Sequence, residues 1–179
     1  QRGEVEPQDV VGAPAQRVDV TAETGPHYLL LNEKDLLRQG AVAKCAPPLR
    51  DEKRRIGLWR ELRAGNIQTV GSDHSPSPPE LKTNPDFFAA WGGIAGCQHG
   101  FELLFSEVAG SLDRDLPLLA AVLARNVARR FRIDAHKGLL TEGRDADFTL
   151  VKPATERVIS ADELWTRHRL SAYVGRRSR

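Results

Sequence analysis

Three side chains in this sequence could bind a metal or move a proton. His27 lies in "ETGPHYL", directly after a Gly-Pro pair, and Asp73 and His74 lie together in "GSDHSP". Imidazole nitrogens and carboxylate oxygens bind zinc, and a carboxylate close to an activated water can take up a proton and pass it on. Taken alone, each residue has a second interpretation, because a loop histidine is often a packing residue and an aspartate often stabilises a turn. The chemistry therefore requires a fold that brings these residues together.

A parallel sheet would bring them together. Period-2 alternation and short apolar runs predict three strands, at residues 17–23, 41–46 and 66–73. Strands that alternate with helices across short connections form parallel βα units, whose strands all end at the same edge of the sheet. His27 follows the first strand, Ala46 ends the second and Asp73 ends the third. We therefore expect these residues to converge at the edge where parallel α/β folds place their chemistry.

The helices between the strands have their own boundary signals. One helix is predicted at 32–40, where Asn32 can cap the start and Gly40 can end it. Another is predicted at 51–65, with Asp51 as its N-cap. Its apolar stripe consists of residues spaced three apart, Ile56, Trp59 and Leu62.

The pattern changes near residue 135. Before that point, a proline-rich loop and two helical segments follow the third strand, at residues 74–86, 93–110 and 116–131. Beyond it, "FTLV" at 148–151 predicts a short strand between turns. A last helix is predicted at 160–168, where Ser160 and Glu163 form a capping box.

Composition narrows the classes of protein to consider. The chain has 179 residues, of which 40% are hydrophobic and 28% charged, with a formal net charge of +2. Basic residues are scattered except in the final "GRRSR", so we expect no nucleic-acid partner. No apolar run reaches membrane-spanning length, so we expect no membrane partner and a cytoplasmic location. Cys45 and Cys97 form no CxxC pair, which favours two reduced thiols over a disulfide or a zinc site.

Six ordered motifs carry a family resemblance. They are "VTAETGPHYL", "KCAPPLR", "SDHSP", "AWGGI", "HKGLLTEGRDADFTLV" and "RHRLSAYVGR". In this order they resemble the C-terminal part of the allantoinase group of cyclic amidohydrolases, to which dihydroorotases and hydantoinases are related. The resemblance covers the chain from about residue 17 to its end, and the first sixteen residues do not match.

The resemblance implies a fold and a cofactor. The fold would be α/β, the last three βα units of a TIM (β/α)8 barrel with part of a small β-sandwich domain. The expected segments are a poorly ordered lead-in, the partial barrel and the partial sandwich with a C-terminal helix and tail, at residues 1–16, 17–134 and 135–179. The family uses two zinc ions to activate a hydroxide, which hydrolyses the hydantoin ring of allantoin to allantoate in purine catabolism. The full-length enzyme would be a homo-oligomer.

The resemblance also implies roles for single residues. His27 would bind one metal; Asp73 would bind the other and, as the catalytic residue, shuttle the proton to the leaving nitrogen. Ala46 and Gly92 would offer backbone groups to the cyclic ureide substrate, and His74 would either contact the substrate or brace the loop. One departure is Gly25, where the family commonly has cysteine.

The variant motifs favour allantoinase over its relatives. Dihydroorotases more usually have asparagine at the position of Ala46 and "DHAPH" at the position of "DHSPS". The motif "WGGI" resembles allantoinases more than hydantoinases. A dihydroorotase or a hydantoinase-type hydrolase remains the alternative.

Most of the family's metal ligands have no counterpart in this sequence. The His-x-His pair, the carboxylated lysine and another strand histidine are missing, and a complete barrel takes about 250 residues. Two hypotheses follow. The chain is either a portion of a hydrolase that is inactive by itself, or a non-catalytic structural or assembly protein. The presence of both His27 and Asp73 favours the first hypothesis.

Overall fold

The protein is described by a computed structural model for residues 19–153 and 155–179. Its α-helices are α2 (Pro26–Leu30), α3 (Glu33–Gln39), α4 (Glu52–Arg63), α5 (Gly100–Val108), α6 (Leu112–Ala120) and α7 (Asn126–Arg130). Its strands are β1 (Glu23–Thr24), β2 (Thr69–Val70), β3 (Arg157–Val158) and β4 (Arg177–Ser178). Short 3-10 turns lie at Gly40–Ala43, Pro79–Lys82, Ala109–Ser111 and Ala161–Glu163, and a π turn at Ala121–Arg125 joins α6 to α7. None of the helices in this part of the chain has the length and hydropathy that a membrane crossing requires.

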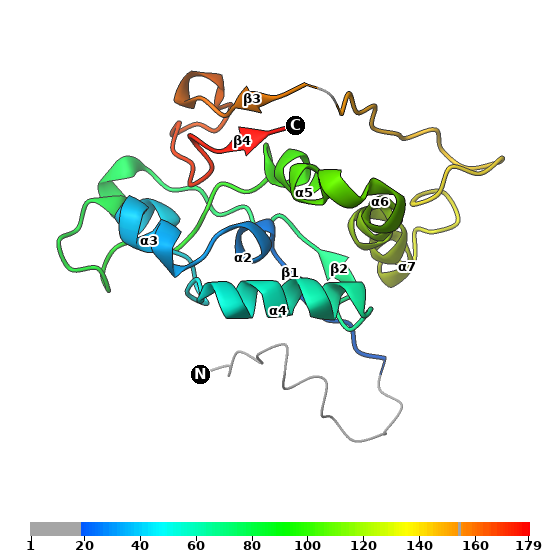
Figure 1. Ribbon diagram of the computed structural model, residues 1–179, viewed down its shortest axis with the longest axis horizontal. Coiled ribbons are helices and arrows are strands. Elements are labelled where there is room, and N and C mark those ends of the chain that lie inside the picture. Colours follow the sequence, from blue (N-terminus) through cyan, green and yellow to red (C-terminus); the bar gives the residue numbers. More distant parts are fainter. Residues whose placement is uncertain (1–18, 154) are drawn as a thin grey trace.

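The centre of the fold is a parallel pair of strands. β1 and β2 run in the same direction, with Glu23 opposite Thr69 and Thr24 opposite Val70. The connection between them contains α2, α3 and α4, and α2 packs against both α4 and α5 (Figure 1). A parallel pair joined through helices is an α/β arrangement, as the sequence predicts.

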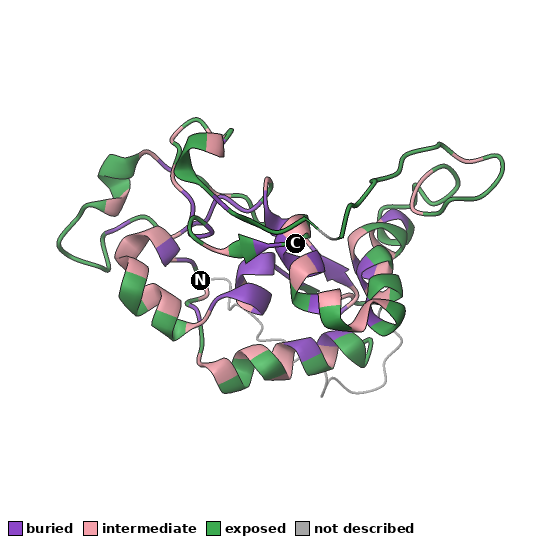
Figure 2. Ribbon diagram, turned by 45° about the horizontal axis from the view of Figure 1, so that its top comes forward, coloured by how far each residue is buried: buried purple, intermediate pink, exposed green. Residues whose placement is uncertain are grey.

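Helices and strands share one apolar core. Buried residues concentrate in α2 and in the strands behind it, whereas the segment from 131 to 153 projects from the fold and is almost entirely exposed (Figure 2). The core comes from residues 29–122 and 159–173 and includes Leu29, Trp59, Leu62, Ile67, Leu104, Val108, Leu119, Ile159 and Tyr173.

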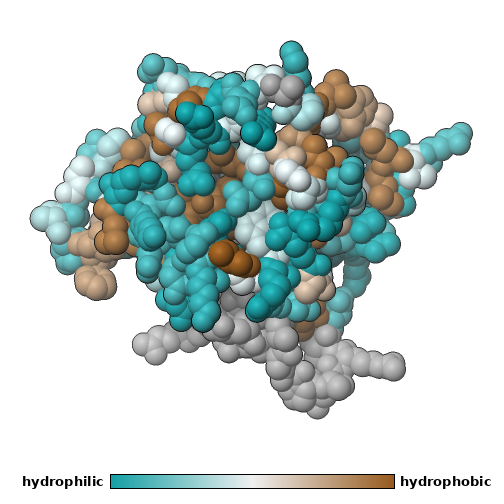
Figure 3. Space-filling view, in the orientation of Figure 1, coloured by the Kyte–Doolittle hydropathy of each residue, from teal (hydrophilic) through white to brown (hydrophobic). Residues whose placement is uncertain are grey.

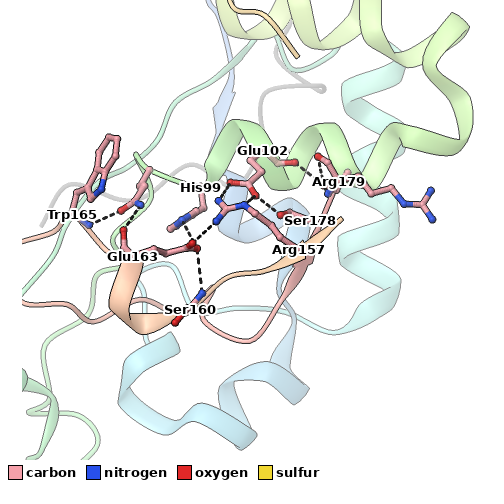
Figure 4. Close-up of polar contacts among 10 residues, drawn as sticks. His99, Glu102, Arg157, Ser160, Glu163, Trp165, Ser178 and Arg179 are labelled. Carbon is pink, nitrogen blue, oxygen red and sulfur yellow. Dashed lines mark hydrogen bonds and ion pairs between the residues drawn. The ribbon is translucent and has the colours of Figure 1, made fainter. Parts of the chain in front are cut away.

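Polar contacts hold the C-terminal segment on α5 (Figure 4). Arg157 on β3 donates to both carboxylate oxygens of Glu102 on α5, at 2.8 and 2.6 Å, and also to Glu163. Nearby, the backbone N–H of Trp165 donates to Gln98 Oε1 at 2.8 Å. The segment is therefore fixed by charge-assisted bonds as well as by its buried residues.

The predicted boundaries of the first helices are confirmed. The Asn32 side chain caps α3, completing a capping box with Asp35, and Gly40 ends that helix with a φ of 59°. The Asp51 side chain accepts the Arg54 N–H at the start of α4. These signals act within one helical turn, which is why the sequence identifies them well.

The predicted stripe on α4 is wrong at one position. Trp59 and Leu62 are buried, but Ile56 is 57% exposed. A spacing of three falls short of the helical repeat of 3.6, so each step turns away from the core. Arg55, four residues before Trp59, faces inward instead and is only 17% exposed.

The strand predicted at 41–46 is also wrong. The chain forms the 3-10 turn Gly40–Ala43 there and continues without regular structure. Burial does alternate, with Ala43 and Cys45 inside and Lys44 half-buried between them. The backbone makes a single bond to the neighbouring segment, in which Gly93 N–H donates to the Lys44 carbonyl at 2.8 Å. Alternating burial therefore arose here without a strand ladder.

Other predicted elements are shorter or absent. Residues 17–18 lie outside the described residues, and of 19–23 only Glu23 belongs to a strand; 66–73 contributes only Thr69–Val70. No strand forms at 148–151. The capping box of Ser160 and Glu163 is present, but it starts a 3-10 turn rather than a helix to 168, because Leu164 is extended and Trp165 bonds to Gln98.

Candidate functional site

His27 lies on α2, a five-residue helix that the sequence did not predict. Pro26 occupies the first helical position, where its fixed φ suits a helix start and its missing N–H costs nothing. The carbonyl of Leu29 accepts hydrogen bonds from Trp59 Nε1 at 2.9 Å and from Arg55 Nη1 at 2.8 Å, both on α4. These two donors fix the helix that holds His27.

His27 is a buried imidazole with unused nitrogens. It is 1% exposed, and neither Nδ1 nor Nε2 has a hydrogen-bond partner among the described residues. Burial lowers the pKa of His27 to about 4, although the charge of Asp73 acts in the opposite direction. The ring is therefore neutral at physiological pH, the form that metal binding requires.

Asp73 faces His27 from the turn after β2. Its Oδ2 lies 3.5 Å from His27 Nε2, and its side chain is 61% exposed. The Asp73 backbone has a φ of 43°, a left-handed conformation that aspartate adopts more readily than most residues. The structure thus brings together two side chains that are 46 positions apart, on the edge that the parallel arrangement predicts.

The segment 93–97 supports the turn that holds Asp73. Ser75 N–H donates to the Ile94 carbonyl at 2.9 Å, and His74 forms an isolated parallel bridge with Ile94. A side chain at Gly96 would overlap the Ser72 carbonyl, so glycine is needed for this close approach. His74 is exposed, and its Nδ1 accepts the Cys97 N–H at 3.2 Å.

Ala46 and Gly92 lie in neighbouring backbone segments. A Cβ added to Gly92 would stand 3.7 Å from the Cys45 carbonyl carbon and 3.8 Å from the Ala46 nitrogen. Lys82 Nζ donates to the Gly93 carbonyl at 2.7 Å, and burial lowers the pKa of Lys82 to about 8. Lys82 therefore fixes the backbone directly after Gly92.

The site residues fit a metal centre in part. The 3.5 Å between His27 Nε2 and Asp73 Oδ2 is close to the roughly 3.4 Å that separates two ligand atoms of a tetrahedral zinc, so both side chains can join one metal centre. A catalytic zinc typically has three protein ligands. Within 19–153 and 155–179, no group of three or more His, Cys, Asp or Glu residues could hold a metal ion.

Sequence reasoning missed several residues that position the site. Arg55 and Trp59 had no assigned contact to α2, and Lys44 had no assigned role. Lys44 Nζ donates to three backbone carbonyls of the loop before Gly92, those of Phe87, Phe88 and Ala90. Spacing carries no signal for such contacts, because their partners lie 26 to 46 positions away.

Comparisons with known proteins find allantoinases, each of which this chain matches over part of its length. No family model matches it. The chain is 50% identical over 169 residues to an allantoinase of Rubrobacter xylanophilus, a match that covers 93% of this chain and 37% of that protein. It is 42% identical over 171 residues to an allantoinase of Bacillus licheniformis, covering 94% of this chain and 37% of that protein. The chain thus spans little more than a third of the length of these relatives.

Solved structures agree on the fold. An L-hydantoinase from Arthrobacter aurescens superposes with a TM-score of 0.85 at 29% identity, over 98% of this chain and 40% of that one. A D-hydantoinase from Thermus sp. superposes with a TM-score of 0.87 at 25% identity, over 96% of this chain and 39% of that one. The chain therefore has part of the α/β fold of these hydantoinases.

Proposed function

We propose that this chain, which is 50% identical to part of an allantoinase, takes part in the hydrolysis of the hydantoin ring of allantoin to allantoate. The observation that carries the proposal is the approach of His27 to Asp73 at 3.5 Å, within the span that matches allantoinases. The chain would supply the last three βα units of a TIM barrel, with a boundary near residue 135 before part of a β-sandwich. The complete enzyme would be a cytoplasmic homo-oligomer of purine catabolism.

A binuclear zinc centre would use His27 and Asp73 as two of its ligands. Two observations support these ligand roles. The neutral imidazole of His27 has no hydrogen-bond partner among the described residues, and the Asp73 carboxylate faces it. The remaining ligands would come from protein outside the described residues. When bound, zinc supplies Lewis acidity and lowers the pKa of a bound water to about 7.

Asp73 would be the proton shuttle. Its carboxylate is exposed enough to meet the substrate and close enough to His27 to share the metal centre. It takes the proton from the attacking water and gives it to the ring nitrogen as the C–N bond breaks. One water is consumed, the carbonyl carbon gains an oxygen, and the nitrogen gains a hydrogen.

Ala46, His74 and Gly92 would bind the ring. The segments of Ala46 and Gly92 lie against each other, and Lys82 and Lys44 fix the backbone around them. Backbone N–H and C=O groups held in this way can pair with the alternating C=O and N–H groups of a cyclic ureide.

The comparisons favour allantoin over other cyclic amides. The curated allantoinases are 38–50% identical to this chain, whereas the hydantoinase structures are 25–30% identical.

The proposal is tested by exchanging the matching span of the R. xylanophilus allantoinase for this chain. We expect the chimera to hydrolyse allantoin and to lose at least about 100-fold in kcat when it carries His27→Ala or Asp73→Asn, since each removes a ligand. His136→Ala, at an exposed position away from the site, is the control. The 179-residue chain alone should bind zinc weakly and should not turn over allantoin. A folded chimera that is inactive while its parent is active would favour the non-catalytic hypothesis.

A further inference from the structure

We propose that His74 binds a carbonyl oxygen of the ring substrate through an Nε2–H donor, and that the backbone amide of Cys97 fixes this tautomer. The substrate half of the proposal rests on the proposed function. The tautomer half rests on the geometry of the turn alone.

The tautomer follows from one hydrogen bond. The Cys97 N–H points to His74 Nδ1 at 3.2 Å. A backbone N–H can only donate, so Nδ1 must present its lone pair. A neutral imidazole has one hydrogen, which is therefore on Nε2.

The contact belongs to a fixed register between two segments. The bridge of His74 to Ile94 and the bond from Ser75 N–H to the Ile94 carbonyl align residues 72–75 with 94–97. Cys97 Sγ also lies 3.3 Å from Ser72 Oγ. If one segment shifted by a residue, a residue with a side chain would replace Gly96 beside the Ser72 carbonyl, where no side chain fits. The amide of Cys97 is thus held opposite His74.

The Nε2–H of His74 is available to donate a hydrogen bond to a substrate. His74 is exposed and directly follows Asp73, which lies 3.5 Å from His27. Within the described residues, no group accepts a hydrogen bond from its Nε2. A cyclic ureide offers both N–H and C=O groups, and a fixed N–H donor pairs only with the C=O. It also stabilises the negative charge that grows on this oxygen during attack.

Two-bond ¹H–¹⁵N spectra of the full 179-residue chain, recorded at alkaline pH, read the tautomer directly. The His74 signals are assigned as those missing from His74→Gln. We expect a pyridine-like Nδ1 and a pyrrole-like Nε2. Cys97→Ala keeps the amide hydrogen and should leave this pattern unchanged, whereas Cys97→Pro removes it and should give a mixture of tautomers. A pyrrole-like Nδ1 in the unsubstituted chain overturns the proposal, even if Cys97→Pro fails to fold.

The donor role is tested in the allantoinase chimera. His74→Phe should lower kcat/KM for allantoin by about 100-fold, as for other donors to a developing oxyanion, and His74→Gln, whose amide can donate, should restore at least about 10-fold of it. Equal loss in both variants overturns the donor role. An inactive chimera overturns the substrate half together with the proposed function, while the spectrum still decides the tautomer.

Discussion

At the scale of single residues, the His27 ring occupies space that a side chain at position 25 would fill, and Gly25 leaves that space free. A Cβ at Gly25 would stand 2.6 Å from His27 Cε1, closer than real Cβ contacts allow. The Gly25 φ of −106° is open to any residue, so the constraint is steric and not conformational. The family resemblance places a cysteine at this position, and here glycine leaves space for the imidazole.

Gly25→Ala should therefore force the ring away from its present position. We expect a loss of roughly 1–3 kcal/mol in the free energy of unfolding, the usual range for overpacking. Gly57→Ala is the matched control, because its Cβ would meet nothing within 4 Å on α4 and should stabilise by about 0.5–1 kcal/mol. Urea unfolding of the three proteins measures both effects, and equal stability of the Gly25→Ala and unsubstituted chains would contradict this steric account.

At the scale of elements, a buried carboxylate joins α4 to α6. Asp115 is 1% exposed and accepts bonds from Arg114, from Arg63 on α4 and from Ser111. These donors, Arg114 foremost, hold the pKa of Asp115 well below its usual range. A carboxyl whose pKa is lower in the folded than in the unfolded protein stabilises the fold above about pH 4, and that contribution disappears as the pH falls further.

Asp115→Asn should lower the free energy of unfolding by about 2 kcal/mol at pH 7, because it removes charged hydrogen bonds from a buried site. The difference between variant and parent should shrink as the pH falls below about 4. Asp113→Asn, on the exposed side of the same first turn, should change little. Denaturant unfolding at several pH values is the measurement; a difference that stays constant down to pH 3 would rule out the carboxylate as its source.

At the scale of the whole molecule, apolar side chains gather on the projecting segment 131–151. Figure 3 shows them at the upper right, where this segment leaves the fold in Figure 1. The most exposed are Phe131, Leu140, Phe148 and Leu150. Apolar side chains that are exposed close together favour association between molecules.

We expect the chain to associate as its concentration rises in sedimentation velocity. The double variant Phe148→Ser and Leu150→Ser should shift the distribution toward monomer, because it removes two of these side chains. Trp165→Ser removes an equally exposed apolar residue, 88% exposed like Leu150, from another part of the surface and should change association less. A monomer at every concentration would show that the segment 131–151 does not mediate self-association.

The sequence by itself determined the features that depend on neighbours in the chain. The caps at Asn32 and Asp51 and the capping box at Ser160 are recognisable because donor and acceptor lie within four residues. The sequence also identified His27 and Asp73 as candidate ligands. Only the tertiary structure decided their 3.5 Å approach, which depends on the register of β1 and β2.

Contacts between residues far apart in the sequence decided the elements that local patterns did not predict. The run at 41–46 alternates in burial, yet it has no strand to pair with, and the helix predicted at 160–168 stops because Trp165 bonds to Gln98. Arg55 reaches Leu29 across 26 positions. Hydrogen bonds of this kind form only after the core has brought distant segments together, so no local pattern in the sequence records them.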